Sequence, residues 1–259
     1  MALTHRHIEI FRALITAGSV TKAAEMLFTS QPTVSRELAR MEQSIGFALF
    51  ERVHLPGAVK RFQDVQPGVN VSIATQESPF LEEWLSAQRY DLGLTEHDAP
   101  PPGTRLTPLI AVDEVCVLPD AHPLLAKRVI ALKDFADQAF ISLSANDPYR
   151  LQIDEAFARA GIARRLLIET PTAVSVCSFV RHGLGIAIVN PLTALDFAGH
   201  TLHIRPLALS LPFRVSVIRP EHRPAHPLAD AFVGALQSEA AALRLQLKRH
   251  TSPKRSSHS

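Results

Sequence analysis

Short hydrogen-bonding side chains and arginines gather over residues 30–40, on the exposed side of a predicted helix. The stretch AGSVTKAAEMLFTSQPTVSR (17–36) predicts two short helices joined by a tight polar turn, because an alanine-rich stripe precedes the turn and Pro32 suits the first turn of a second helix. Hydroxyl and amide groups at a helix start suit base edges in a DNA major groove, and guanidinium groups further along suit phosphates. The candidate DNA-contacting residues are Ser19, Thr21, Ser30, Gln31, Pro32, Thr33, Ser35, Arg36 and Arg40.

A small core of three helices would position this second helix. Its members are the apolar residues Ile8, Phe11, Leu14, Ile15, Ala23, Ala24, Leu27, Phe28, Val34, Leu38 and Met41. The alternative is an ordinary helical hairpin with a solvated polar face, because polar helix faces are common. The alanine pair, the capped turn and the proline start occur together here, and that combination favours the DNA-binding interpretation.

Beyond residue 54 the chain alternates strand-like and helix-like segments, which predicts an α/β fold with largely parallel sheets. The glycines at 183 and 185 do not form a dinucleotide-binding loop, because they follow a helix instead of opening one; a helix cap and turn explains them better. The expected strands are 69–74, 91–95, 105–110, 114–118, 140–143, 166–169, 186–189 and 213–218, and the expected helices are 79–88, 147–160, 173–182 and 228–247.

Residues 3–52, which include IEIFRALITAGSVTKAAEMLFTSQPTVSRELARMEQSIGFALFER, resemble the N-terminal winged helix-turn-helix of LysR-type transcriptional regulators. Three later segments, QESPFLEEWLSAQRYDLGLTE, DEVCVLPDAHPL and VSVCSFVRHGLGIAIVNPLTALD, resemble the regulators of lysine biosynthesis in that family. The resemblance implies a transcriptional regulator that binds double-stranded DNA and responds to a small-molecule effector.

The family also implies a domain organisation: a helix-turn-helix with a truncated wing, then a two-lobed α/β effector domain like periplasmic solute-binding proteins, with chain crossings between the lobes near 111–114 and 216–219. The expected boundaries are 1–53 for the DNA-binding domain, 54–247 for the effector-binding domain (lobe I about 54–112 and 217–247, lobe II about 113–216) and 248–259 for a basic disordered tail.

By the same resemblance, the effector binds between the lobes, where strand ends and helix N-termini present N–H groups to carboxylates. The regulators of lysine biosynthesis activate the gene for diaminopimelate decarboxylase, so the implied effector is diaminopimelate or lysine. Glu77 and Asp147 would take ammonium groups, and Arg150 would take carboxylates together with serines and threonines; the alternative for each residue is a structural role, such as helix capping by Asp147. The candidate effector-binding residues are Gln76, Glu77, Ser78, Ser142, Ser144, Asp147, Tyr149, Arg150, Thr170 and Thr172.

The sequence departs from the family after Val53. Relatives continue with a wing, a linker helix that pairs two subunits and the first strand of the effector domain, whereas here Val53 runs directly into HLPGAVKRF (54–62), which resembles the helix after that strand. The chain is therefore short by about fifty residues, judged by length. It lacks the segment that builds the family's homo-oligomer, and one position in the lobe I sheet is vacant. The alternative function is therefore a small-molecule-binding module that no longer binds operator DNA.

Composition limits the number of domains, the compartment and the kinds of site that the chain can have. A chain of 259 residues with 46% hydrophobic content can form more than one core. The formal net charge is +2, and residues 244–259 hold five Lys/Arg and no acid, so the basic character is concentrated at the end. Without a signal peptide or an apolar run of spanning length, we expect a cytoplasmic protein. Cys116 and Cys177 form no CxxC pair, and no GxSxG or HExxH motif occurs, so we expect no metal, no cofactor and no enzyme activity.

Overall fold

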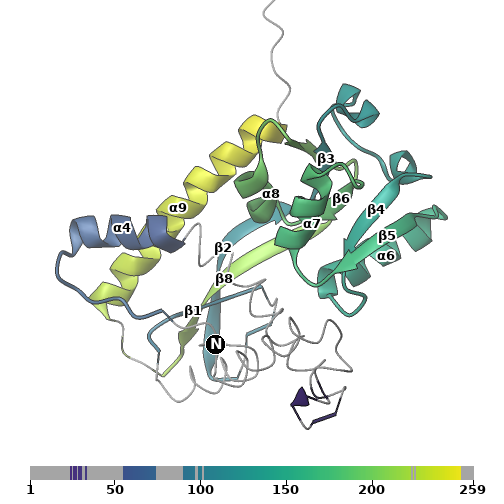
Figure 1. The fold of residues 1–259 in the computed structure, drawn as a ribbon. Coiled ribbons are helices and arrows are strands. Elements are labelled where there is room, and N and C mark those ends of the chain that lie inside the picture. Colours follow the sequence, from purple (N-terminus) through teal and green to yellow (C-terminus); the bar gives the residue numbers. More distant parts are fainter. Residues whose placement is uncertain are drawn as a thin grey trace, which may run out of the picture.

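The computed structural model describes residues 55–73, 90–96, 99–100, 102–222, 224 and 226–251, together with Ala24, Met26, Leu27, Thr29, Ser30 and Thr33. The predicted helix 79–88 and most of the predicted helix-turn-helix lie outside these residues. Figure 1 shows the described elements in two groups, which we name lobe I and lobe II, joined by a pair of long strands.

Lobe I is a three-stranded sheet with two helices packed on it. The strands are ordered β1 (Gly93–Thr95), β8 (Pro212–Pro220) and β2 (Thr104–Asp113), and β8 is antiparallel to both neighbours. Helix α4 (Leu55–Val65) buries Leu55, Ala58 and Phe62 on one face at helical spacing. That face meets α9 (Pro227–Thr251), where the Phe62 and Phe232 rings pack edge to face at 5.3 Å.

Lobe II is built around β3 (Val115–Pro119), whose five residues are all buried. It lies between β6 (Ala187–Val189) and β7 (Leu202–Pro206), antiparallel to both. Strands β4 (Ala139–Leu143) and β5 (Arg165–Thr170) pair in parallel, and a bridge between Phe140 and Ile186 joins β4 to the start of β6. Helices α6 (Pro148–Ala160), α7 (Ala173–Arg181) and α8 (Pro191–Phe197) and the 3₁₀ turns Pro123–Ala126 and Leu132–Phe135 complete the lobe.

The chain crosses between the lobes at two adjacent points. Strands β2 and β8 pair along their lengths, from Thr104 opposite Pro220 to Asp113 opposite Pro212, and just beyond them the Glu114 N–H donates to the Leu211 carbonyl at 2.8 Å. The first crossing therefore lies near 111–114, as predicted. The second lies at 211–212, and the prediction of 216–219 is wrong because those residues pair with β2 inside the lobe I sheet.

The prediction of largely parallel sheets is also wrong for the described strands. Four of the five pairings between named strands are antiparallel, and only β4 with β5 is parallel. The cause is topological: β8 inserts between β1 and β2, and β3 inserts between β6 and β7. Strands that run in the same direction are thus separated by one that runs the opposite way, which an alternation of local segments does not reveal.

The predicted strand 69–74 is absent in its described part, because residues 69–73 have no strand structure. Val69 and Val71 are half-buried, and Ile73 is 51% exposed. The hydrogen bonds of this stretch to other described residues are local: the Val69 N–H donates to the Gln66 carbonyl, and the Gln63 side chain donates to the Val69 carbonyl. A strand-like segment is expected to stay unpaired in this way when the strand beside it in the sheet is missing from the sequence.

The other predicted elements in the described part are confirmed to within a few residues, and their ends follow the sequence signals. Asp147 caps α6, Pro148 opens it and Gly161 closes it with φ 65°. Gly183 follows α7 with φ 75°, which confirms its interpretation as a turn after a helix. Helix α9 ends at Thr251, so residues 248–251 of the expected tail are helical. None of the described helices has the length and apolar character needed to span a membrane.

Candidate ligand site at the junction of the lobes

The N-termini of α6 and α7 follow two adjacent parallel strands. Ser142 of β4 lies opposite Glu169 of β5, and Leu143 lies opposite Thr170, so both strands end at the same edge of the sheet. Beyond these ends, Asp147 caps α6 and Thr172 caps α7. Backbone N–H groups and the positive ends of two helix dipoles therefore gather at this edge, which favours anionic groups of a ligand.

Asp147 has a structural role that the geometry defines. Its Oδ1 accepts hydrogen bonds from the Tyr149 N–H at 2.8 Å and the Arg150 N–H at 3.2 Å, and its own N–H donates to the Ser144 carbonyl at 2.9 Å. Burial raises the pKa of Asp147, and the two N–H donors lower it. Capping, the structural alternative, is thus observed, and ammonium binding by Asp147 stays a prediction.

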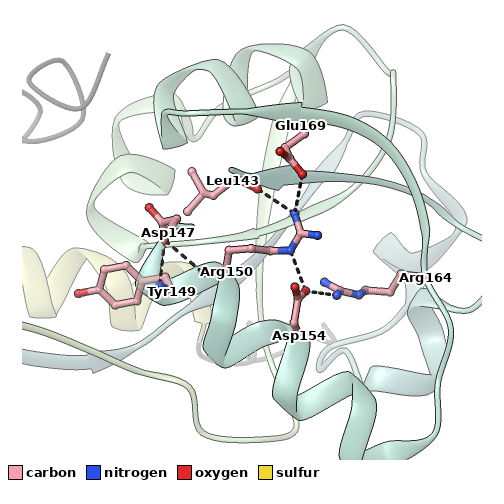
Figure 2. A network of polar contacts seen from close by, with 7 residues as sticks. All are labelled: Leu143, Asp147, Tyr149, Arg150, Asp154, Arg164 and Glu169. Carbon is pink, nitrogen blue, oxygen red and sulfur yellow. Dashed lines mark hydrogen bonds and ion pairs between the residues drawn. The ribbon is translucent and has the colours of Figure 1, made fainter. Parts of the chain in front are cut away.

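Arg150 lies in a polar network that fixes α6 against the strand ends (Figure 2). Its Nη1 donates to the Leu143 carbonyl at 2.9 Å and to Glu169 at 3.3 Å, and its Nε donates to Asp154 at 2.7 Å. Asp154 also accepts from Arg164, whose guanidinium lies 4.3 Å from the centre of the Phe157 ring. The geometry makes Arg150 a residue that positions the α6 N-terminus, and its predicted contact with a ligand carboxylate stays a prediction.

Replacing this arginine is expected to destabilise the fold. Arg150→Ala removes a guanidinium whose side chain is only 10% exposed and leaves Asp154 and Glu169 without one partner, so we expect a loss of about 2 kcal/mol in the free energy of unfolding. The control is Arg159→Ala on the same helix, where the Arg159 and Glu155 side chains are 73% and 62% exposed and we expect less than about 0.5 kcal/mol. Urea unfolding measures both, and equal losses would contradict the positioning role.

Two carboxyl groups that the sequence interpretation did not select lie at the junction of the lobes. Glu114 occupies the first crossing, and its residue is 2% exposed. Among the described residues no donor reaches either oxygen of its carboxyl group. Burial raises the pKa of Glu114 well above its ordinary range, and the charges of Glu96 and Asp147 raise it further.

Glu96, directly after β1, brings a carboxyl group from lobe I to the same place. The pKa of Glu96 is raised to about 7: burial raises it most, a hydrogen bond with Tyr149 lowers it, and the charge of Asp147 raises it further. Glu96 is nevertheless an exposed residue, so water weakens the effect of burial on its pKa. The Tyr149 ring, from lobe II, packs 5.5 Å from the Phe213 ring of β8. We call the region of Glu96, Glu114, Asp147 and Tyr149 the lobe junction.

The remaining predicted effector residues fall at the strand ends or outside the described chain. Ser142 is buried, and no described residue is a hydrogen-bond partner of its hydroxyl group. Thr170 is buried at the end of β5, and Thr172 Oγ1 accepts from the Ser175 N–H at 3.1 Å and donates to the Ser175 hydroxyl at 2.9 Å. The residues that lie outside the described part are Gln76, Glu77 and Ser78.

Among the candidate DNA-contacting residues, the structure describes Ser30 and Thr33. The Ser30 hydroxyl accepts from the Thr33 N–H at 3.3 Å and lies 2.8 Å from the Thr33 hydroxyl, as expected if Ser30 caps the second helix. The candidates outside the described residues are Ser19, Thr21, Gln31, Pro32, Ser35, Arg36 and Arg40.

A signal for the missed carboxyl groups was present in the sequence. Glu114 stands in VDEVCV, at the first position of the expected strand 114–118, and a carboxyl group beside such an apolar run is a candidate for burial. Glu96 directly follows a predicted strand, in the same way that Ser144 and Thr172 follow theirs. Reading every strand end for carboxylates would have selected both.

Comparisons with known proteins agree with the two predicted parts of the chain. The family model described as the LysR substrate binding domain matches residues 39–241, and the model for bacterial regulatory helix-turn-helix proteins of the lysR family matches residues 5–56. The two matches overlap, so no residues of this chain stand between them as a linker.

Transcriptional activator protein LysR of Escherichia coli is 44% identical over 290 aligned residues, which cover 92% of this chain and 93% of that protein. The aligned length exceeds the 259 residues of this chain, so part of the relative stands opposite gaps, as an internal shortening requires.

Solved structures support the fold. HinK, a LysR family transcriptional regulator from Pseudomonas aeruginosa, is 20% identical with a TM-score of 0.61, over 92% of this chain and 98% of that one. The effector-binding domain of QuiR in complex with shikimate is 19% identical with a TM-score of 0.57, over 74% of this chain and 93% of that one. The relatives that this chain matches across both domains are transcriptional regulators, not enzymes. The chain belongs to the LysR family of bacterial transcriptional regulators.

Proposed function

We propose that this LysR-type regulator binds operator DNA and activates the gene for diaminopimelate decarboxylase, in lysine biosynthesis, in response to diaminopimelate or lysine. The observation that carries the proposal is the 44% identity to the E. coli activator across both domains. The cytoplasm is the compartment in which such a regulator meets DNA.

The chemistry of the lobe junction is compatible with such an effector. Diaminopimelate carries two ammonium and two carboxylate groups, and lysine carries two ammonium groups and one carboxylate. The N-termini of α6 and α7, with the hydroxyl group of Thr170, suit carboxylates. The carboxyl groups of Glu96 and Glu114 suit ammonium groups.

A second candidate is a small-molecule-binding module that no longer binds operator DNA. Two observations favour it: the family matches overlap without an intervening linker, and residues 69–73 form no strand. In this case the family's dimer would lack its usual linker helix, and two half-sites would not be spanned in the usual way.

A gel-shift assay separates the two candidates. We expect the purified chain to retard a palindromic promoter fragment from the diaminopimelate decarboxylase gene, and Arg36→Ala to abolish the retarded band, because that arginine of the reading helix would hold a DNA phosphate. Arg159→Ala, an exposed arginine of lobe II, is the control and should leave the band unchanged. If no retardation occurs below the concentration at which unrelated DNA is bound, the regulator proposal fails and the second candidate stands.

A further inference from the structure

Helix α9 carries a single apolar stripe that continues into its last turns. The helix has 25 residues, so at the usual rise per residue its axis is about 37 Å long, which is as long as a small domain is wide. Apolar side chains recur every three or four positions along one face, as an amphipathic helix requires. The members of the stripe are Val233, Leu236, Ala240, Leu243 and Leu247.

The partner of this stripe changes along the helix. Its first four members, up to Leu243, belong to the hydrophobic core that lobe I builds from α4, β2 and β8. Leu247, one turn later, packs against the hydrophobic core of lobe II, which contains residues of β3, β4, β6, β7 and α7. Figure 1 shows the same course: α9 begins beside the lobe I sheet and ends beside α8. One helix therefore has its two ends on different lobes.

Helix α8 is divided between the lobes in the same way. Leu192 of α8 is buried in the lobe I core, whereas Ala194 of the same helix is buried in the lobe II core. Helix α9 contacts α8 and also β7, which are both elements of lobe II. The lobes are thus joined by packing of helices in addition to the two chain crossings.

Polar contacts hold the last turns of α9 in place. Arg244 Nη2 donates a hydrogen bond to the Leu109 carbonyl of β2, just before the stripe reaches lobe II. The Thr251 hydroxyl donates to the Leu247 carbonyl at 2.9 Å, one turn back along the helix. Basic side chains at 248–250 interact favourably with the negative end of the helix dipole. These interactions favour a helix that stays formed up to its contact with lobe II.

The strand pair β2 and β8 would allow the lobes to rotate if it were their only link. The two crossings are adjacent, since the Glu114 N–H donates to the Leu211 carbonyl at 2.8 Å, and a few residues at neighbouring strand ends are the usual form of a hinge. The end of α9 is a further link that does not belong to this strand pair. Rotation of lobe II relative to lobe I must therefore separate Leu247 from the lobe II core or unwind the last turns of α9.

We propose that residues 244–251 are a strap that fixes the angle between the lobes, and that Leu247 is the side chain through which the strap holds lobe II. A solute that rotates the lobes when it binds must displace this side chain, so the strap sets the lobe angle of the ligand-free chain. The strap is independent of the proposed function, because it is built from contacts within residues 55–251 and involves no particular ligand.

The test measures the distance between the lobes of the full chain by pulsed electron paramagnetic resonance. Spin labels are attached at Asp64→Cys on α4 and Glu155→Cys on α6, where the native side chains are 63% and 62% exposed. Cys116 and Cys177 do not compete for the label, because both are buried and burial raises the pKa of both thiols. We expect one narrow distribution of distances in this labelled chain.

Leu247→Ala in the labelled chain should weaken the strap. Truncating this half-buried leucine is expected to raise the fraction of molecules outside the narrow distribution by about tenfold. Leu247→Asp should have a larger effect, because a carboxylate at this position must leave the apolar core of lobe II. The matched control is Leu245→Ala, which makes the same change on the 60% exposed face of the helix and should leave the distribution unchanged.

Hydrogen exchange on the same variants separates a strap from a helix end that is merely packed. Both Leu247 variants should exchange faster over residues 247–251, whichever role that helix end has. If exchange accelerates while the distance between the lobes keeps its single narrow distribution, the inference is overturned. An equal change of distance in Leu245→Ala would contradict the assignment of Leu247.

Discussion

Restoring the missing segment between Val53 and His54 is expected to tighten operator binding by at least 100-fold. One copy of residues 1–53 carries six Lys/Arg against five Asp/Glu, so its attraction to phosphate is weak on its own. A linker helix that pairs two subunits would tether two reading helices at the spacing of two half-sites, and such tethering raises affinity by about 10² to 10⁴ without any new contact. The segment to insert is the corresponding part of the E. coli activator, which is 44% identical to this chain.

Gel shift on the same promoter fragment measures the gain, and light scattering coupled to size exclusion measures the oligomeric state. The control is an insertion of equal length made of glycine and serine, which cannot form the paired helix and should leave the affinity unchanged. Equal affinity of the restored and the original chain would show that this chain already presents two reading helices to DNA in some other way.

The same insertion should change lobe I. If the restored segment supplies the missing first strand, residues 69–73 gain a neighbour with which to pair, and Ile73, now 51% exposed, is expected to become buried. Hydrogen exchange over these residues would report that pairing as protection that the original chain lacks. The exposed strand-like sequence is thus a structural sign that the effector domain is shorter than its fold requires.

Local signals in the sequence predicted the helix ends well. Asp147, Pro148 and Gly161 bound α6 as their chemistry requires, because a cap, a first-turn proline and a left-handed glycine each act within a few residues. The strand ends that carry Ser144 and Thr172 were predicted for the same reason. Half of the candidate site, the edge with the two helix N-termini, therefore follows from local chemistry.

The other half depends on contacts between distant residues. Glu96 and Glu114 come together only because β8 inserts between β1 and β2 and the chain crosses the lobes at 113–114 and 211–212. No local pattern encodes which strand inserts where. Arg150 is a similar case. Its sequence position suggests a ligand-binding residue, but its partners Leu143 and Glu169 lie on two neighbouring strands, and local sequence does not reveal that contact.

Gly185→Ala is expected to cost about 3 kcal/mol or more in the free energy of unfolding. A Cβ atom at this position would lie 2.4 Å from the Ala139 carbonyl oxygen and 3.0 Å from its carbon, and both atoms belong to the backbone of β4. That backbone is fixed, because the Ile186 N–H donates to Ala139 at 2.8 Å and the Ile141 N–H donates to Ile186 at 2.9 Å. The constraint on Gly185 is therefore close approach, whereas Gly183, two residues earlier, is constrained by its positive φ.

Relief of the clash would have to move β4 away from the start of β6. Phe140 and Ile186 are fully buried at this contact, so the movement would open the lobe II core and displace the strand end that leads to α6. The control is Gly234→Ala at an exposed position of α9, where a Cβ meets no atom within 4 Å and the helix should gain about 0.5 to 1 kcal/mol. In urea unfolding, the free energy of unfolding should be lower than that of the wild type for Gly185→Ala and higher for Gly234→Ala. Equal stability of Gly185→Ala and the wild type would mean that β4 and β6 can separate without loss, and the strand ends would then not hold the ligand site in place.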